Sequence, residues 1–168
     1  KLGAPNEAPP CVDEETAPRH TDEELFKQPP PTEECPICML PQPLDEEHIS
    51  YRVCCGKTLC IGCIDAVKAE DNQITCPFCR TPASTSDREY IERLKKRVEG
   101  DDARAISLIG CHYYDGEYGL QQNYRKAYGF WLRAGELGYA VGNFNLGVAY
   151  DNGEGVEKDV KKSKHFYE

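Results

Sequence analysis

Cysteine is the residue type whose number and spacing in this chain most directly predict chemistry. Ten cysteines occur among 168 residues, and eight lie within one short segment, largely as pairs separated by two residues. A Cys-x2-Cys pair directs two thiolates at one ion, and Zn²⁺ prefers four such ligands in a tetrahedron. In a chain with no evident secretory signal, this spacing favours zinc over disulfides. The eight are Cys35, Cys38, Cys54, Cys55, Cys60, Cys63, Cys76 and Cys79.

Eight thiolates would complete two sites of four ligands each. Such closed sites leave no coordination position for water, so the predicted zinc is structural and not catalytic. A module of roughly 45 residues buries too little apolar surface to fold alone. Metal binding would contribute roughly 10–16 kcal/mol per site and thereby drive folding. We therefore expect two structural Zn²⁺ ions within residues 34–82.

This segment resembles the RING finger of ubiquitin ligases. The motifs that carry the resemblance are Cys35-Pro36-Ile37-Cys38, Cys55-Gly56-Lys57-Thr58-Leu59-Cys60-Ile61-Gly62-Cys63 and Cys76-Pro77-Phe78-Cys79-Arg80. The resemblance implies a small zinc-stabilised α+β domain in which the ligand pairs interleave. It assigns one ion to Cys35, Cys38, Cys60 and Cys63, and the other to Cys54, Cys55, Cys76 and Cys79.

The sequence departs from the usual RING pattern at one ligand. Lys57 stands where most RINGs have a histidine, and a protonated lysine cannot ligate a metal. The segment is therefore similar to the rarer all-cysteine RINGs, although Cys54 and Cys55 are adjacent here instead of separated by one residue. If that geometry fails, His48 could replace one of the two.

The resemblance also implies an activity, in which the domain binds a ubiquitin-conjugating enzyme charged with ubiquitin and orients the thioester for attack by a substrate lysine. Ile37, Val67 and Pro77 match the positions that contact the conjugating enzyme, although the first two could be core residues and Pro77 could only rigidify a turn. Arg80 matches the residue that hydrogen-bonds both partners, for which its planar, forked guanidinium is suited; it could also be a solvated surface arginine. The alternative function is a non-catalytic zinc-binding scaffold.

Two other regions have helical patterns. Residues 86–99 begin with the capping-box pattern Ser86-x-x-Glu89 and carry apolar residues on one face. Residues 102–168 contain an internal repeat, first 37 residues apart and then 36 after a one-residue shift. Each unit predicts two amphipathic helices, the first unit over 102–114 and 124–137, with the second unit cut short. The matched pairs are Ala103 and Ala140, Gly110 and Gly147, Tyr113 and Tyr150, Gly116 and Gly153, Lys126 and Lys162, and Phe130 and Phe166.

A period near 36 residues is typical of an α-solenoid. The repeat resembles the Sel1-like repeat, a relative of the tetratricopeptide repeat, in Ile109-Gly110-x2-Tyr113 and Leu146-Gly147-x2-Tyr150. The resemblance implies an all-α helical-repeat solenoid that offers a surface to a substrate or adaptor protein. The helix over 86–99 could hold the zinc module against this solenoid.

Composition limits the remaining possibilities. The net charge is −9, which disfavours nucleic-acid binding and anionic membrane surfaces. Residues 1–33 are rich in proline and acidic residues, so we expect a disordered tail. No segment has the apolar length of a transmembrane helix. We expect a soluble intracellular protein, cytoplasmic or nuclear.

Overall fold

The computed structural model describes residues 33–43, 46–70 and 75–167, and those from Glu33 onward belong to one compact unit. The predicted disordered tail lies outside the described residues except for Glu33, and the limits of the predicted domains stay predictions. No helix in the described ranges combines the length and apolar character that a membrane span requires.

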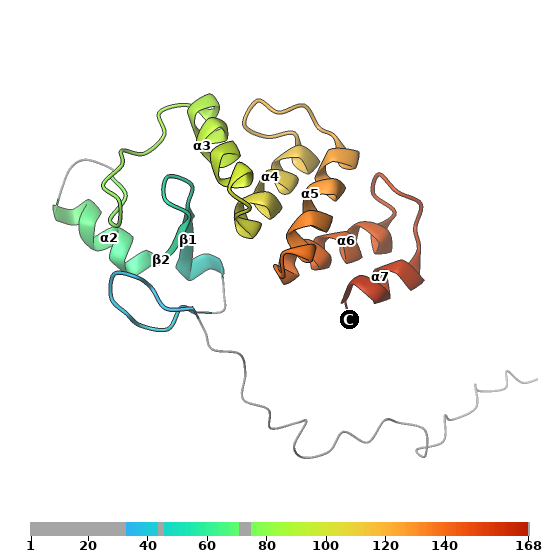
Figure 1. Cartoon of the computed structure of the whole chain (residues 1–168), viewed down its shortest axis with the longest axis horizontal. Coiled ribbons are helices and arrows are strands. Elements are labelled where there is room, and N and C mark those ends of the chain that lie inside the picture. Colours follow the sequence, from blue (N-terminus) through green and yellow to red (C-terminus); the bar gives the residue numbers. More distant parts are fainter. Residues whose placement is uncertain (1–32, 44–45, 71–74, 168) are drawn as a thin grey trace, which may run out of the picture. The chain divides into compact units, whose positions relative to one another are not determined.

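The cysteine-rich part is built around one β-hairpin (Figure 1). A short 3-10 helix, η1 (Glu46–His48), leads into β1 (Ile49–Arg52), which pairs antiparallel with β2 (Lys57–Cys60). Ile49 pairs with Cys60 and Arg52 with Lys57, so the hairpin turn carries Cys54 and Cys55. Helix α2 (Ile61–Glu70) follows β2 directly.

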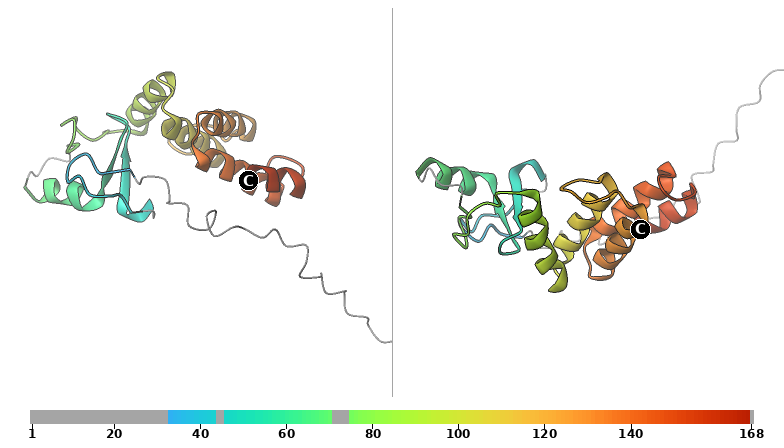
Figure 2. Two further views of the ribbon diagram at one scale, coloured as in Figure 1. Left: turned by 60° about the horizontal axis from the view of Figure 1, so that its bottom comes forward. Right: turned by 90° about the horizontal axis from the view of Figure 1, so that it is seen from above.

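Five helices follow in chain order (Figures 1 and 2). They are α3 (Asp87–Glu99), α4 (Ala103–Asp115), α5 (Tyr124–Glu136), α6 (Ala140–Asn152) and α7 (Val160–Tyr167). The bounds of α3, α4 and α5 agree with the predicted ranges to within one residue, which is the usual uncertainty of helix ends. The helical-repeat region is therefore confirmed as all-α.

The N-terminus of α3 shows half of the predicted capping box. The hydroxyl of Ser86 accepts from the Glu89 N–H at 3.3 Å, as predicted. The Glu89 carboxylate, however, accepts from the backbone N–H and hydroxyl of Thr85, at 2.8 and 3.0 Å, and not from the N–H of Ser86. The reciprocal bond has moved one residue toward the N-terminus, where it still satisfies a backbone donor.

The sequence repeat becomes a repeat of contacts. Tyr113 of α4 stacks on Phe130 of α5 at 5.7 Å and 9°, and Tyr150 of α6 stacks on Phe166 of α7 at 5.8 Å and 7°. A lysine from the second helix of each pair lies over the tyrosine ring, 5.0 and 5.2 Å from its centroid. The tyrosines thus hold each helix pair together, as expected of packing residues.

Close approach of the helices depends on small residues. A Cβ atom built on Gly110 of α4 would lie 2.7 Å from two ring atoms of Trp131, and one on Gly147 of α6 would lie 2.6 Å from Tyr167. Such separations are shorter than real Cβ contacts, so a larger residue at either position would force the facing ring to move. The matched glycines of the sequence repeat therefore set how close the paired helices lie.

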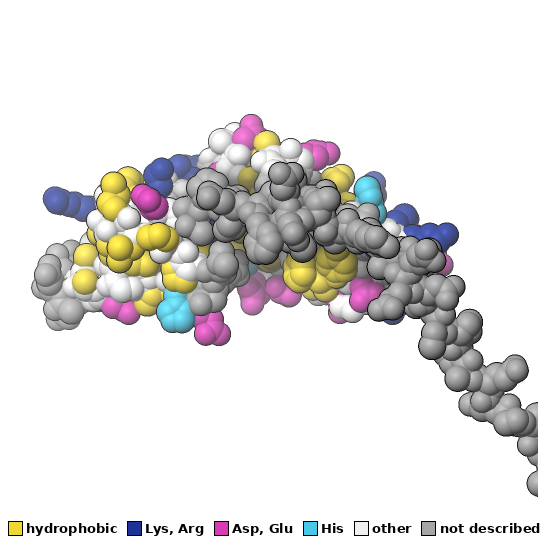
Figure 3. All heavy atoms as spheres, turned by 90° about the horizontal axis from the view of Figure 1, so that it is seen from below, with side chains coloured by type: hydrophobic (Ala, Val, Ile, Leu, Met, Phe, Trp, Pro, Cys, Tyr) yellow, Lys and Arg dark blue, Asp and Glu magenta, His cyan; other side chains and the backbone are white. Residues whose placement is uncertain are grey.

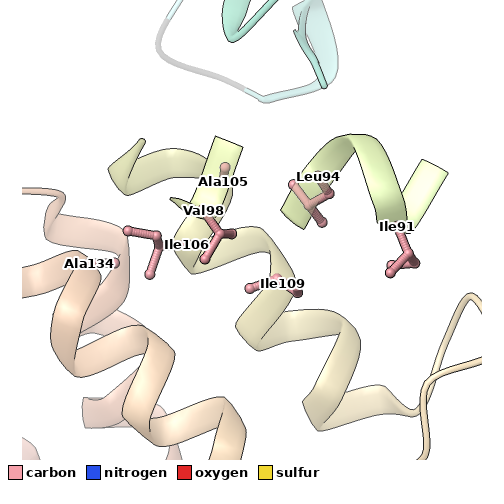
Figure 4. Close-up of a cluster of buried hydrophobic side chains, with 7 residues drawn as sticks. All are labelled: Ile91, Leu94, Val98, Ala105, Ile106, Ile109 and Ala134. Carbon is pink, nitrogen blue, oxygen red and sulfur yellow. The ribbon is translucent and has the colours of Figure 1, made fainter. Parts of the chain in front are cut away.

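The largest apolar cluster joins α3 to the repeats. Figure 4 shows its seven buried residues, three on α3, three on α4 and one on α5. They are Ile91, Leu94, Val98, Ala105, Ile106, Ile109 and Ala134. Helix α3 therefore shares a continuous core with the first repeat, and burial of such side chains stabilises the packing by roughly 1.5–3 kcal/mol each for the larger ones.

Candidate metal centres

The first group of sulfur atoms comes from both sides of the hairpin. Cys35 and Cys38 precede the hairpin, Cys60 ends β2, and Cys63 lies in the first turn of α2. All four Sγ atoms lie within 4.8 Å of one another, and those of Cys38 and Cys60 are 3.8 Å apart. Cys35 is fully buried and forms the core of the cysteine-rich part together with Leu59, Ile64 and Cys76.

The second group joins the hairpin turn to the last cysteine pair. Cys54 and Cys55 lie in the hairpin turn, and Cys76 and Cys79 lie in the segment that precedes α3. Their Sγ atoms again lie within 4.8 Å of one another, with 3.9 Å between Cys55 and Cys76 and 3.5 Å between Cys79 and Cys54. The adjacent cysteines thus both reach one centre, and the grouping is the one that the resemblance implied.

The distances within each group fit a tetrahedral thiolate site. With Zn–S bonds of about 2.3 Å, the edge of a tetrahedron of sulfur atoms is about 3.8 Å, and the three separations above lie close to it. Disulfide sulfurs would be about 2.05 Å apart, and all described cysteines are free. Four sulfur donors in this arrangement suit zinc, and each group could hold one metal ion.

Ionisation of the thiols supports the same interpretation. Cys35 is desolvated, but backbone N–H groups directed at its sulfur prevail and lower its pKa to about 6. Desolvation and bonding with neighbouring sulfurs raise the pKa of Cys63 to about 12. In the second group, desolvation opposes ionisation of Cys79, but hydrogen bonds from Thr81 prevail and lower its pKa to about 6. Desolvation and the hydrogen bond with Cys79 raise the pKa of Cys54. Cys35 and Cys79 thus ionise readily, whereas ionisation of Cys63 and Cys54 is opposed, a conflict that a bound dication relieves.

The two Cys-x2-Cys pairs that flank the hairpin have the same backbone geometry. The N–H of the residue after each pair donates to the carbonyl of the first cysteine, Met39 to Cys35 and Arg80 to Cys76, both at 2.8 Å. Met39 and Arg80 have φ values of 59° and 57°, in the left-handed region that residues other than glycine seldom adopt. We call each of these two turns, residues 35–38 and 76–79, a knuckle. The knuckles fix the backbone from which the Met39 and Arg80 side chains project into solvent.

The alternative ligand His48 does not join the sulfur groups, and Lys57 lies outside them too. His48 is exposed at the end of η1 and belongs to neither cluster found among the described residues. Lys57 is also exposed, with its Nζ atom 6.0 Å from the ring centroid of Phe78. The geometry favours Cys54 and Cys55 over the His48 variant.

An apolar surface surrounds the knuckles. Ile37 is 41% exposed, whereas Val67 on α2 and Pro77 are half-buried. Hydrophobic side chains gather over the cysteine-rich part, on the left of Figure 3. Sequence reasoning missed three large members of this surface, which are Met39 (67% exposed), Leu40 (64%) and Phe78 (44%). Their position next to the predicted ligands was the available signal, because short loops around a metal offer little core in which to bury them.

Comparison with known proteins concerns the helical part. The family model of the Sel1 repeat matches residues 103–139 and 140–168, so the match begins after the cysteine-rich residues. Among solved structures, the crystal structure of a Sel1 repeat protein from Oxalobacter formigenes is 30% identical, with a TM-score of 0.45. That alignment covers 47% of this chain and 32% of the other, so this chain matches about a third of that protein's length. Residues 103–168 of the chain are Sel1 repeats.

Proposed function

We propose that this chain is a RING-type ubiquitin ligase with two structural zinc ions and with Sel1 repeats as its protein-interaction surface. The observation that carries the proposal is the interleaving of two four-sulfur groups beneath knuckles that present apolar side chains. Sel1 repeats suggest an interaction surface for the protein to be modified or for an adaptor.

The metal ions in this proposal have a structural role. When bound, each zinc ion cross-links loops that have too small an apolar core to hold themselves in place. The cysteines fix the two knuckles and the hairpin turn, and no coordination position is left for a substrate. The chain itself therefore contributes binding and orientation, and the reacting thioester belongs to the partner.

The proposed docking surface for the conjugating enzyme consists of Ile37, Val67 and Pro77, extended by Met39, Leu40 and Phe78. Complete burial of a side chain of this size stabilises a complex by roughly 1.5–3 kcal/mol. Ile37 is the most informative of the predicted three, because its exposure leaves it available to a partner and its removal leaves the buried core intact.

Arg80 is proposed to bridge the conjugating enzyme and its ubiquitin. Its knuckle holds the backbone in place, its side chain is exposed, and its guanidinium can donate in several fixed directions. A charge-assisted hydrogen bond contributes roughly 1.5–3 kcal/mol. Made only in the reactive arrangement, it would accelerate transfer about 10- to 100-fold.

The decisive experiment measures ubiquitin discharge from charged conjugating enzymes onto free lysine. The zinc-loaded chain should accelerate discharge for at least one enzyme of a broad panel, and Ile37→Ala should reduce the acceleration. Phe144→Ala is the matched control, because Phe144 is also an exposed apolar residue (56%) but lies on α6 in the repeats. If no enzyme of the panel responds while two zinc ions are bound, the alternative holds and the chain is a non-catalytic zinc scaffold.

A further inference from the structure

The turn that carries Cys54 and Cys55 contacts the helices directly. The guanidinium of Arg97, near the end of α3, donates from Nη2 to the Cys54 carbonyl at 2.8 Å. Gly56 follows with φ of 70°, and a Cβ atom there would lie 2.8 Å from the Asp102 Oδ2 atom. The backbone of the second sulfur group is therefore held at the junction of α3 and α4.

Asp102 connects this junction to the start of the first repeat. Its Oδ1 atom accepts from the Ala105 N–H at 3.1 Å and so caps α4. Its Oδ2 atom accepts from the hydroxyl of Tyr51, on β1, at 2.6 Å. Burial and, after it, this bond raise the pKa of Tyr51 well above its ordinary value, so the hydroxyl stays a donor. One carboxylate thus holds both the hairpin and the N-terminus of the repeat helix.

Side-chain packing adds to these bonds. Tyr51 and Val53 pack against the apolar cluster that α3, α4 and α5 share. The Arg104 guanidinium lies 6.0 Å from the centroid of the Tyr51 ring and donates to the Thr58 hydroxyl at 3.3 Å. The hairpin is therefore part of the helical core and does not merely precede it in the chain.

The two sulfur groups differ in this respect. Within the described ranges, the hydrogen bond between a candidate metal ligand and α3 or α4 is made by Cys54, and none of the first group makes one. A repeat array requires a terminal element that covers its first unit. The second sulfur group is bonded to α3, the helix that packs against the first unit.

We propose that the second metal centre, formed by Cys54, Cys55, Cys76 and Cys79, acts as the N-terminal cap of the repeat array. An ion bound there fixes the hairpin turn, whose Cys54 carbonyl bonds Arg97 of α3. It also fixes the end of β1, from which Tyr51 bonds Asp102, the residue that caps α4. The inference rests on the proposed metal binding and is independent of ligase activity. Because coupling between two sites is reciprocal, the docked helices also strengthen metal binding.

The test compares the full chain with two variants that remove single contacts at the junction. Arg97→Met removes the bond to the Cys54 carbonyl, and Tyr51→Phe removes only a hydroxyl, which keeps the test valid if the first variant folds poorly. Arg88→Met is the matched control, because Arg88 is an exposed arginine of α3 that pairs with Glu92. Competition with a chromogenic chelator measures the affinity for each zinc ion, and native mass spectrometry counts the ions.

We expect Arg97→Met to lower the affinity for one of the two zinc ions at least tenfold, as loss of a charge-assisted bond implies. Arg88→Met should leave both affinities unchanged. Tyr51→Phe should lower the affinity for the same ion as Arg97→Met. In hydrogen-exchange measurements, chelation of zinc should speed exchange in α4 of the unmodified chain. It should have a smaller effect on α4 of Arg97→Met, in which the junction is already released.

Unchanged zinc affinities in both variants, or α4 exchange that does not respond to chelation, would overturn the capping role. Two bound ions without such coupling would contradict this inference alone. Fewer than two bound ions would contradict the proposed metal binding as well. Discharge activity is measured separately, so the failure of the ligase proposal is distinguishable from either result.

Discussion

Replacement of Gly110 by alanine tests whether close helix packing defines the repeat. An added methyl group at this position would lie 2.7 Å from Trp131 Cδ1 and Nε1 and 3.2 Å from the Ala127 carbonyl. Overpacking of this kind costs about 1–3 kcal/mol. Displacement of the indole would also break its 3.2 Å bond to the Ser107 carbonyl, worth about 1 kcal/mol. Helix propensity returns about 1 kcal/mol, so Gly110→Ala should destabilise the chain by about 1–3 kcal/mol.

Gly129→Ala is the matched control for this substitution. Gly129 lies within α5, and a Cβ atom there would have no atom within 4 Å. The same methyl group should therefore stabilise the chain by up to about 1 kcal/mol through helix propensity. The two variants differ in what surrounds the added atom and not in chemistry.

Urea unfolding of the zinc-loaded chain, followed by tryptophan fluorescence, gives both free energies. Trp131 is the single tryptophan of the sequence and is 4% exposed, so its emission reports on the contact under test. The free energies of the two variants should differ by about 1–4 kcal/mol. If Gly110→Ala is at least as stable as the unmodified chain while Gly129→Ala behaves as expected, the packing argument is wrong.

Three further outcomes are expected. Arg80→Ala should retain both zinc ions but slow ubiquitin discharge about 10- to 100-fold, whereas a rate equal to that of the unmodified chain would remove its proposed role. His48→Ala should also retain two ions by native mass spectrometry, and loss of one would restore histidine as a ligand. Burial lowers the pKa of His112 below 6.5, against the opposing influence of Glu117. The unfolded chain therefore binds a proton that the folded chain excludes, and the free energy of unfolding should fall as the pH drops below 6.5. His112→Asn should flatten that part of the pH profile of urea unfolding, and an unchanged slope would contradict the assignment.

The helices could be predicted because their signals are local. Apolar residues at helical spacing and a Ser86 cap marked α3, and the near-constant period of the matched residues marked both repeat units. A cap or a periodic apolar face depends on residues a few positions apart, so it can be predicted without knowledge of the tertiary structure. One local prediction was wrong, because the Glu89 carboxylate accepts from the N–H of Thr85 and not from that of Ser86.

The arrangement of the cysteines needed more than spacing. Cys-x2-Cys predicts that two thiolates share an ion, but spacing does not say which pairs combine, and the interleaved grouping came only from resemblance. The contact between Tyr51 and Asp102 left no sequence signal, because it joins residues 51 positions apart through a single hydrogen bond. Exposure of Met39 and Leu40 was likewise missed, since it depends on how tightly the first knuckle closes.

Each repeat contributes the same set of interlocking parts. Gly116 ends α4 and Gly153 ends α6 with nearly identical left-handed backbones, and each pair of helices carries its own stacked tyrosine and phenylalanine. Such units are interchangeable building blocks. Insertion or deletion of one whole repeat would lengthen or shorten the array and keep the contacts between neighbouring helices. An insertion of any other length would disrupt those contacts on both sides.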